Sequence, residues 1–492
     1  MSTWEKRTGL LWSEPLIFEG GSPGHPGLEI GRSDVPEPAP EELIPEGLLR
    51  STAANLPEVS EPEVVRHFSR LASWNYSVDQ GFYPLGSCTM KYNPKVNEFL
   101  SSLTGFSMLH PEVPEEECQG ALRLMFELSQ YLAQISGMDE VTLQPAAGAQ
   151  GELTGMLMVR AYHEDRGKPR EKVLIPDTAH GTNPSSASHA GYKVQEIPTD
   201  HQGILSPEVV AGFMDQSVAA LMLTNPNTLG LFESHISEIS EIVHKAGGLV
   251  YCDGANLNAL MGIARPGDMG VDLMQFNLHK TFSTPHGGGG PGAGPVGVKK
   301  ILEPFLPVPR IERRGQGFVL ECQNQPKSIG KVTGYYGNFA VMVKAYAYIR
   351  RLGAKGLLRA SRMALLNANY LRVKLRHHYH IPHSDYCMHE CVFSDKNLPN
   401  EVITMDVAKR LMDYGFHPPT IYFPLVVHGA MMIEPTETES KATLDEFISA
   451  MARIKEEAET TPDIVKSAPH NTPVARLDEV QAARHPRLRW KP

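Results

Sequence analysis

The chain has 492 residues, of which 41% are hydrophobic and 21% charged, values typical of a globular enzyme with two or more domains. A net charge of −10 at pH 7 argues against nucleic acid as the main partner. Six cysteines are too few for a disulfide scaffold. The N-terminus lacks the apolar core of a secretory signal, and no apolar stretch is long enough to span a membrane. We therefore expect a cytoplasmic protein without a membrane-bound part.

The N-terminal segment is rich in Pro, Gly and Glu and contains short apolar islands such as Leu16-Ile17-Phe18. This composition predicts an extended arm laid over another surface. Helical spacing of apolar residues begins near Glu61. We assign the arm and this first helix to residues 1–75.

The next part of the chain alternates between apolar runs and helical patterns. Apolar runs at 172–175, 192–197, 219–223 and 248–252 are separated by helical spacing, for example at 207–214 and 236–246. This alternation predicts a mainly parallel sheet flanked by helices, an α/β fold, over residues 76–335. Residues 336–492 change in character and predict a smaller C-terminal α+β domain with a docked tail.

Two residues at strand ends carry the strongest chemical signal. Asp253 ends a buried strand, where open α/β sheets place ligand-binding groups. Lys280 follows a second apolar run and lies between His279 and Thr281, just before a glycine tract. A desolvated lysine loses its proton readily and becomes a nucleophile, although a lysine near glycines is often an ordinary loop residue. Together the pair suits pyridoxal phosphate (PLP), with the lysine as Schiff base and the carboxylate on the ring nitrogen.

Further polar turns follow other predicted strands. The small residues Ala147, Gly148 and Ala149, with Gln150, precede an apolar helix and leave backbone N–H groups free to bind phosphate. His180 lies at a strand mouth, where it either stacks on a flat ring or has a structural role. The nearby Asn225 is placed to hydrogen-bond a phenolic oxygen.

Two other classes of site are poorly supported. The tract from Gly292 to Gly297 formally matches a dinucleotide fingerprint, but Pro295 interrupts it. Cys387, His389 and Cys391 resemble a metal cluster. On a strand, however, the two cysteines would lie roughly 13 Å apart, too far to share one ion. We therefore predict no metal.

Several longer motifs resemble the glycine cleavage system P-protein, the PLP-dependent decarboxylating glycine dehydrogenase, from about residue 10 to the end. The chain is similar to subunit 2 of the two-chain form, which carries the PLP lysine. It departs from the family pattern at Cys391 and His428, neither of which belongs to the lysine motif. The motifs that carry the resemblance are Gly81-Phe-Tyr-Pro-Leu-Gly-Ser-Cys-Thr-Met-Lys-Tyr-Asn-Pro, Ala147-Gly-Ala-Gln-Gly-Glu, Ala179-His-Gly-Thr-Asn-Pro, Thr224-Asn-Pro-Asn-Thr-Leu-Gly, Asn277-Leu-His-Lys-Thr-Phe and Met432-Ile-Glu-Pro-Thr-Glu-Thr-Glu-Ser.

The resemblance implies a PLP-dependent transferase of fold type I. It also implies decarboxylation of glycine with transfer of the aminomethyl group to the lipoyl arm of the H-protein. By this resemblance, we expect Lys280 to form the Schiff base, Asp253 to contact the pyridinium nitrogen and His180 to stack on the ring. The phosphate would be bound by the turn of Ala147, Gly148, Ala149 and Gln150, with Asn277 or His279, and the ring hydroxyl by Asn225 or Thr228. The loop that closes over glycine would contain Ser87, Cys88, Thr89 and Lys91.

The resemblance also implies partners. We expect a homologous subunit 1, a heterodimer doubled into a heterotetramer, and lipoylated H-protein, with no nucleic acid and no membrane. Two alternatives stay open at this point. One is a stand-alone PLP aminotransferase or amino-acid decarboxylase, which would share Asp253 and Lys280. The other is a non-catalytic partner subunit that keeps the fold without the cofactor.

Overall fold

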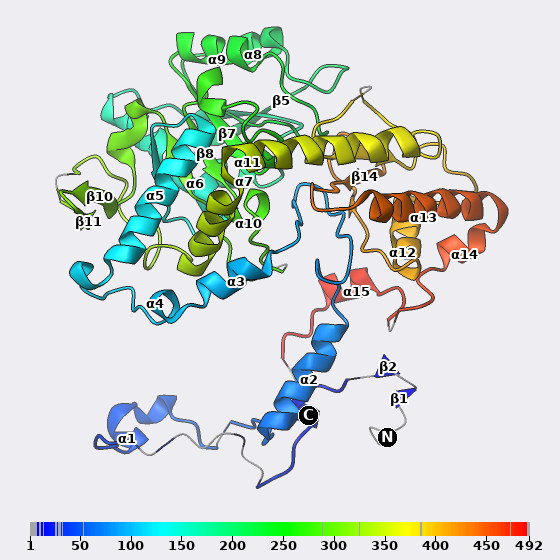
Figure 1. Ribbon diagram of the computed structural model, residues 1–492, viewed down its shortest axis with the longest axis horizontal. Coiled ribbons are helices and arrows are strands. Elements are labelled where there is room, and N and C mark those ends of the chain that lie inside the picture. The colour runs from blue at the N-terminus through cyan, green and yellow to red at the C-terminus, as the bar shows by residue number, and fades with distance from the viewer. Residues whose placement is uncertain are drawn as a thin grey trace. The chain divides into compact units, whose positions relative to one another are not determined.

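The computed structural model describes the chain apart from residues 1–6, 9–10, 13, 25–26, 28–30, 32, 53, 288, 324, 384–385, 473 and 490–492. Parts of the predicted arm and the end of the predicted docked tail therefore lie outside the described residues. The chain forms two compact units (Figure 1). One comprises Met1–Tyr76 and Asn471–Pro492, and the other comprises Ser77–His470. The predicted domain boundaries at 75/76 and 335/336 stay predictions.

A seven-stranded sheet is the centre of the unit Ser77–His470, in the order β3-β9-β8-β7-β6-β4-β5. The five strands from β8 to β5 are parallel, and β9 is antiparallel to both of its neighbours. The mainly parallel sheet predicted from the sequence is confirmed. Its strands are β3 (Glu140–Thr142), β4 (Lys172–Pro176), β5 (Lys193–Ile197), β6 (Val218–Thr224), β7 (Leu249–Gly254), β8 (Leu273–Phe276) and β9 (Val296–Val298).

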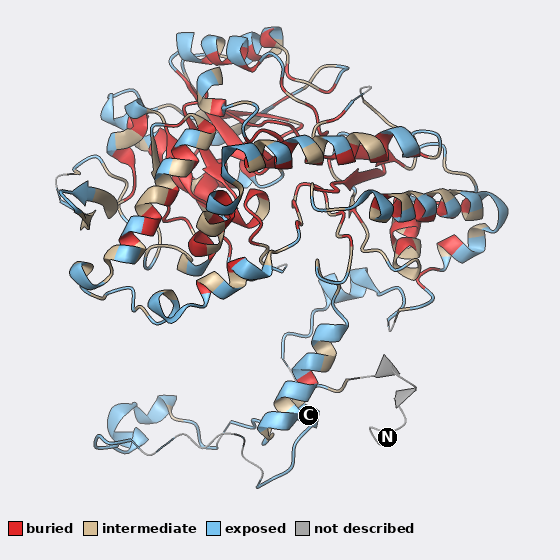
Figure 2. Ribbon diagram, in the orientation of Figure 1, coloured by how far each residue is buried: buried red, intermediate tan, exposed pale blue. Residues whose placement is uncertain are grey.

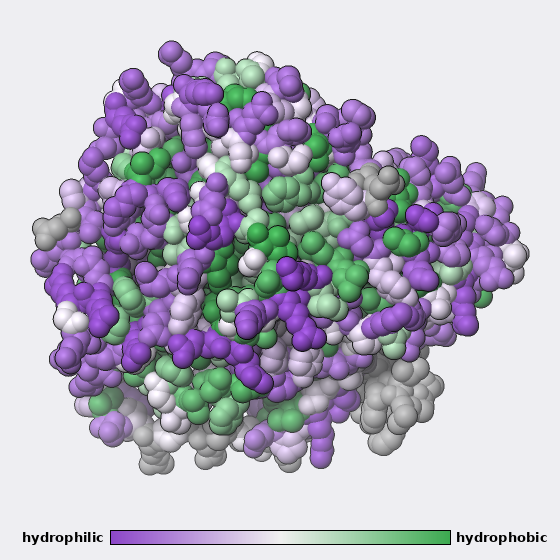
Figure 3. Space-filling model, turned by 45° about the horizontal axis from the view of Figure 1, so that its top comes forward, coloured by the Kyte–Doolittle hydropathy of each residue, from purple (hydrophilic) through white to green (hydrophobic). Residues whose placement is uncertain are grey.

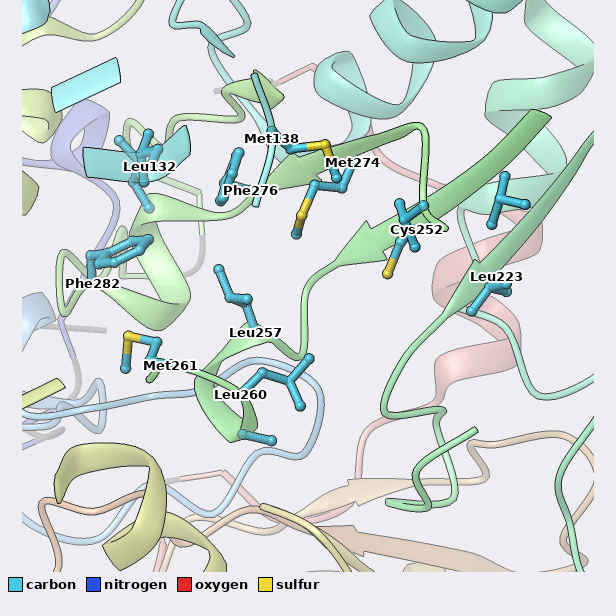
Figure 4. Packing of buried hydrophobic residues seen from close by; sticks show 14 of the residues in the cluster. Leu132, Met138, Leu223, Cys252, Leu257, Leu260, Met261, Met274, Phe276 and Phe282 are labelled. Atoms are coloured by element: carbon cyan, nitrogen blue, oxygen red, sulfur yellow. The ribbon is translucent and has the colours of Figure 1, made fainter. Parts of the chain in front are cut away.

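Helices cover this sheet because its strands are apolar on both faces. Leu223, Cys252 and Met274 are register partners on one face, where they join a buried cluster with residues of α5 and α9 (Figure 4). Met222 and Tyr251 alternate with them and pack with residues of α6 and α7. The helices of this part are α3 (Lys95–Ser101), α4 (Thr104–Ser107), α5 (Gln119–Ser136), α6 (Gly148–Asp165), α7 (Asn183–His189), α8 (Pro207–Phe213), α9 (Ile236–Lys245) and α10 (Leu278–Thr281).

The same alternation brings polar side chains to the carboxyl edge of the sheet. Thr224, Asp253 and Gln275 are register partners, two residues beyond Met222, Tyr251 and Leu273 on the same face. The chain order of the parallel strands reverses between β4 and β6. Such a switch point is where open α/β sheets bind ligands.

A second, antiparallel sheet has the order β12-β14-β13 and packs with helices around its own buried cluster. This is the α+β pattern predicted for the C-terminal part. Gly353, with φ of 60°, interrupts the long helix α11. The remaining elements of this unit are β10 (Arg310–Arg314), β11 (Gly317–Glu321), β12 (Cys391–Ser394), β13 (Thr420–Ile421), β14 (Ala430–Ile433), α11 (Phe339–Leu375), α12 (Thr404–Asp413), α13 (Lys441–Thr460) and α14 (Pro462–Lys466).

The predicted strand geometry around Cys387 and Cys391 is wrong. Strand β12 begins only at Cys391, so Cys387 and His389 lie on the segment before it. Burial and a hydrogen bond between the two thiol groups raise the pKa of Cys391. Both cysteines are free thiols. The distance argument against a shared ion therefore fails, and the prediction that the chain binds no metal stays a prediction.

The unit that contains the N-terminus includes β1 (Arg7–Thr8), β2 (Leu11–Trp12), α1 (Pro40–Leu43), α2 (Glu61–Ser73) and α15 (Glu479–Arg484). Helix α2 begins at Glu61 as predicted, and the Ser60 N–H donates to Glu63 Oε2 at 2.7 Å. Leu16 and Phe18 are 54% and 39% exposed.

Burial in the unit Ser77–His470 is concentrated on the large sheet and on the inner faces of its helices (Figure 2). One outer face of the molecule is largely hydrophilic, with smaller hydrophobic areas among the polar side chains (Figure 3). In the described part of the chain, we find no helix that combines the length and the apolar character needed to cross a membrane.

Candidate active site

Lys280 lies on α10, directly after β8, while Asp253 lies near the end of the neighbouring strand β7. Both predicted residues are therefore at the carboxyl edge of the same sheet. Among the described residues, none forms a hydrogen bond or ion pair with the Lys280 ammonium group. Its charge influences the pKa values of these side chains, which indicates that they surround it: Cys88, His180, His279, His389, Glu390 and Glu434.

The carboxylate of Asp253 is fully buried and has hydrogen-bond partners on both oxygens. Asn183 Nδ2 donates to Oδ2 at 2.8 Å. The Ala255 N–H donates to Oδ1 at 2.9 Å, and Gln275 Nε2 donates to the same oxygen. His180 Nδ1 lies 3.9 Å from Oδ2. These contacts fix the carboxylate in place at the edge of the sheet.

His180 connects Asp253 to a second buried carboxyl group, Glu152. His180 Nδ1 lies 3.0 Å from Thr182 Oγ1, which donates to Glu152 Oε1 at 2.6 Å. Burial, reinforced by the charge of Asp253, raises the pKa of Glu152 to about 7. Burial lowers the pKa of His180, although Asp253 opposes this shift. At neutral pH, His180 therefore presents an uncharged ring beside Asp253.

The turn at residues 147–150 forms the N-terminus of helix α6. Ala147 is the N-cap residue and supplies no side-chain cap, while the Ala146 N–H donates to Gln150 Oε1 at 2.7 Å. A Cβ atom added to Gly148 would lie 2.1 Å from Asn277 Oδ1, so this helix end directly faces Asn277. The N-terminus of an 18-residue helix carries a partial positive charge and unpaired N–H groups. It fits a phosphate group.

Buried polar atoms provide a test of whether a polar cofactor fits here. Five such atoms in the segments that follow β4, β7 and β8 have no hydrogen-bond partner among the described residues, whereas buried polar atoms are normally paired. A polar ligand at the carboxyl edge of the sheet would supply partners. PLP has three groups that suit this site: a phosphate for the N-terminus of α6, an aldehyde for the Lys280 amine and a ring nitrogen for the Asp253 carboxylate. The five atoms are Thr178 Oγ1, Asn183 Oδ1, Asn256 Oδ1, Thr281 Oγ1 and Thr284 Oγ1.

Three other predicted cofactor residues lie at the same edge but already contact protein groups. Thr228 Oγ1 donates to the Thr178 carbonyl at 2.8 Å, and Asn225 Oδ1 accepts the Glu233 N–H at 3.0 Å. His279 Nδ1 accepts the N–H of Ala293, and burial lowers the pKa of His279 to about 3. Their roles toward a cofactor stay predictions.

The predicted substrate loop is held next to Lys280. Ser87 and Thr89 have φ of 57° and 47°, a left-handed conformation that non-glycine residues rarely adopt. Lys91 is fully buried, where its Nζ donates to the Thr281 carbonyl at 2.8 Å and lies 2.7 Å from Glu437 Oε1. Between these residues, Cys88 has a pKa raised by burial, which the charge of Lys280 opposes.

Sequence reasoning missed five residues of this neighbourhood: Asn183, Gln275, His389, Glu390 and Glu434. Two of them had a usable signal. Asn183 belongs to the same polar turn as His180, and Gln275 shares the strand face of Asp253 by register. The other three are brought near Lys280 only by the packing of the second sheet, for which the sequence carries no local signal.

The sheet, with a lysine and an aspartate at the ends of neighbouring strands and an uncapped helix N-terminus beside them, defines a PLP-dependent enzyme of fold type I. Comparison with known families agrees. Residues 153–290 match the family described as aminotransferase class-V. Residues 360–474 match the family described as glycine dehydrogenase, C-terminal domain.

Full-length relatives are more specific. A protein of Caldanaerobacter subterraneus subsp. tengcongensis, named probable glycine dehydrogenase (decarboxylating) subunit 2, is 57% identical over 96% of this chain and 98% of its own length. A protein of Pyrococcus horikoshii with the same name is 55% identical over 98% of this chain and 96% of its own length. The chain therefore belongs to the glycine dehydrogenase (decarboxylating) subunit 2 family.

Solved structures support the fold. An inhibitor-bound glycine decarboxylase (P-protein) of the glycine cleavage system gives a TM-score of 0.72 at 22% identity, over 84% of this chain and 94% of that chain. A cysteine desulfurase from Thermococcus onnurineus NA1 gives 0.60 at 16% identity, over 77% and 95%. The predicted fold class and family resemblance are confirmed.

Proposed function

We propose that this chain is the PLP-carrying subunit of a glycine-decarboxylating enzyme that transfers the remaining aminomethyl group to the lipoyl arm of the H-protein. One observation carries the proposal: Asp253 and Lys280 lie at the carboxyl ends of neighbouring parallel strands in a chain that is 57% identical to a protein named as subunit 2 of this enzyme. The cytoplasmic location is part of the proposal, supported by six cysteines that are all free thiols.

The residues of the site divide the work of holding the cofactor. The Lys280 amine would hold the aldehyde, and the N-terminus of α6, with Asn277, would bind the phosphate. Asp253, itself fixed by Asn183 and Gln275, would keep a proton on the ring nitrogen. When bound, PLP supplies an electrophilic aldehyde and a ring that accepts the electron pair left by departing CO2.

The surrounding side chains would control access and orientation. The uncharged ring of His180 lies beside Asp253 and is placed to cover one face of a flat cofactor. The loop from Ser87 to Lys91 would exclude water from the reacting amine, because Lys91 holds it against the residue that follows Lys280. Water exclusion strengthens the electrostatic interactions inside such a site.

The proposal includes a second chain. The relatives are named as subunit 2, which supports a subunit 1 partner, and we propose a heterodimer doubled into a heterotetramer. Leu16 and Phe18 are largely exposed on the N-terminal arm and would lose contact with water at such an interface.

Reconstitution tests the function. The chain is purified alone and with subunit 1, and glycine–bicarbonate exchange is measured with and without lipoylated H-protein. We expect exchange only when all components are present, and its loss by more than about a thousandfold in Lys280→Ala, or about 4 kcal/mol. Lys299→Ala is the control, because this lysine lies at the opposite edge of the sheet, where its Nζ donates to the Gly137 carbonyl. Full exchange without subunit 1, or in Lys280→Ala, would contradict the proposal.

A further inference from the structure

Two buried glutamates hold the loop next to Lys280 by its backbone. The Ser87 N–H donates to Glu390 Oε2 at 2.7 Å, and the Thr89 N–H donates to Glu434 Oε2 at 2.9 Å. These are the two loop residues with left-handed backbone conformations. Each glutamate therefore uses one oxygen to fix the loop.

The second carboxylate oxygens of the two glutamates differ in their hydrogen-bond partners. Glu390 Oε1 lies 3.4 Å from the Ser87 hydroxyl and 3.4 Å from Asn256 Nδ2, both donors. Among the described residues, Glu434 Oε1 has no hydrogen-bond partner, although Glu434 is fully buried. A buried carboxylate oxygen without a donor is costly, so this atom indicates a missing ligand.

A histidine points at the same place. His389 is also fully buried, and neither of its ring nitrogens has a hydrogen-bond partner in the described part of the chain. Its Nε2 lies 3.8 Å from Glu434 Oε1 and 4.0 Å from Glu390 Oε2, too far for direct hydrogen bonds. The three side chains thus face a common point that no described protein atom bridges.

The chemistry of this point suits an amine. Glu434 Oε1 is an acceptor without a donor in the described part of the chain, and an ammonium group supplies N–H donors. Lys280 and Lys91 both act electrostatically on His389 and Glu434, so the cluster lies close to the lysine of the active site. Burial raises the pKa of Glu390 well above its ordinary range and that of Glu434 to about 7. Near neutral pH, Glu434 can therefore gain or lose a proton, while His389, with a pKa lowered to about 3, is uncharged.

We propose that Glu434 Oε1, which lies beside Glu390 and His389, receives the ammonium group of the incoming amino-acid substrate and takes one of its protons. The proposal rests on the proposed function and identifies a positioning and proton-accepting group for it. An N–H bond of the ammonium breaks, the nitrogen keeps the electron pair, and Glu434 becomes a carboxylic acid. The neutral amine is then a nucleophile, and the proton can pass on to the Lys280 amine.

The first test uses the cofactor-free assembly of the two subunits, with methylammonium as the probe. Infrared spectroscopy follows the carboxylic acid band as the pH is raised. We expect a band that titrates near pH 7 and whose midpoint moves downward with methylammonium, because a bound cation favours the charged carboxylate. This shift with methylammonium should be absent in Glu434→Gln.

Glu233→Gln is the matched control. Glu233 is also buried with a pKa raised to about 7, but the Leu205 N–H and Asn227 Nδ2 donate to its two oxygens. We expect Glu233 to titrate without responding to methylammonium. A spectrum in which methylammonium has no effect on any carboxyl band, or the same effect in Glu434→Gln, would overturn the proposal.

The second test uses the cofactor-loaded assembly and the change in cofactor absorbance on mixing with glycine. In the parent, we expect the rate to fall as the pH drops below about 7, because protonated Glu434 cannot accept a proton. Glu434→Gln should slow this change by roughly tenfold or more and abolish its pH dependence. Glu434→Asp, which keeps a titrating carboxyl group, should retain a pH midpoint.

The outcomes separate the inference from the proposed function. If Glu434→Gln does not assemble, the parent profile still decides, since a rate independent of pH between about 6 and 8 would overturn the inference. If the parent catalyses glycine–bicarbonate exchange and Glu434→Gln behaves like the parent, only the proposed role of Glu434 is refuted. Absence of exchange in the complete parent system would refute the function itself.

Discussion

Two buried carboxylate groups near Lys280, those of Asp253 and Glu434, differ in how completely they are hydrogen-bonded. Asp253, on the large sheet, has donors from Asn183, Gln275 and the Ala255 backbone on its two oxygens. Glu434, after β14 of the second sheet, has a donor on one oxygen and, among the residues that the structure describes, none on the other. A carboxylate held on both sides has a fixed position, whereas one with an open oxygen can accept a further hydrogen bond.

This difference assigns two kinds of work to one chemical group. A fixed carboxylate suits a permanent contact with a cofactor, because its geometry does not depend on a ligand. Burial raises the pKa of Glu434 to about 7, so a cation bound at its open oxygen would favour the charged form. Comparing variants of Asp253 and Glu434 therefore tests whether the two carboxylates have these different roles.

The largest effect is expected at Asp253. Asp253→Asn keeps the shape but removes the charge that holds a proton on the ring nitrogen, so glycine–bicarbonate exchange should fall about a hundredfold, or about 3 kcal/mol. Asp272→Asn is the control, since Asp272 is a buried aspartate that precedes β8 and accepts the Val250 N–H. Exchange at the parental rate in Asp253→Asn would contradict the assignment of Asp253 as the partner of the ring nitrogen.

A smaller effect on stability is expected at Glu434. Its pKa is raised to about 7 in the folded protein, so the folded state holds the proton more tightly and loses stability as the pH rises through 7. The Glu434→Gln variant has no titrating carboxyl group at this position, so it does not lose stability in this way. Its free energy of unfolding, relative to the parent, should therefore increase by about 2 kcal/mol between about pH 5 and about pH 8.

Denaturant unfolding at the two pH values measures this difference. Glu233→Gln should show a similar trend, because burial also raises the pKa of Glu233 to about 7. The two variants should thus agree in stability and differ in their response to amines. A Glu434→Gln difference that does not change with pH would show that Glu434 is not a titrating group of the folded protein.

The smallest effect is expected at the helix end that faces Asn277. In Gly148→Ala, the new methyl group would lie 2.1 Å from Asn277 Oδ1 and would displace that side chain. We expect roughly tenfold weaker retention of the cofactor, or about 1.4 kcal/mol, measured by equilibrium dialysis. Gly212→Ala on α8 should have no effect, because its Cβ meets no atom within 4 Å. Equal retention in both variants would argue against a phosphate at this turn.

Much of the large sheet could be predicted from the sequence, because its strands are short apolar runs separated by helical spacing. Asp253 and Lys280 were predicted for the same reason: each directly follows such a run, and parallel strands place these positions at one edge. The helix end at Gly148 was also predicted, since small residues before an apolar helix mark it locally.

The residues around His389 could not be predicted in this way. The residues just before β12 were interpreted as part of a strand, whereas residues 386–390 lie outside any strand. Glu390 and Glu434 reach the loop at Ser87 and Thr89 across more than 300 residues of chain. Contacts of this range are set by the packing of the second sheet, which local spacing does not encode.

The most direct test of the central claim is to reduce the PLP-loaded protein with borohydride and map the modified residue by mass spectrometry. Reduction locks the cofactor to the amine that holds it. We expect one pyridoxyl group per chain, on the peptide containing Lys280, and none in Lys280→Ala. A pyridoxyl group on another lysine, such as Lys91 or Lys299, would contradict the assignment of Lys280 and the function built on it.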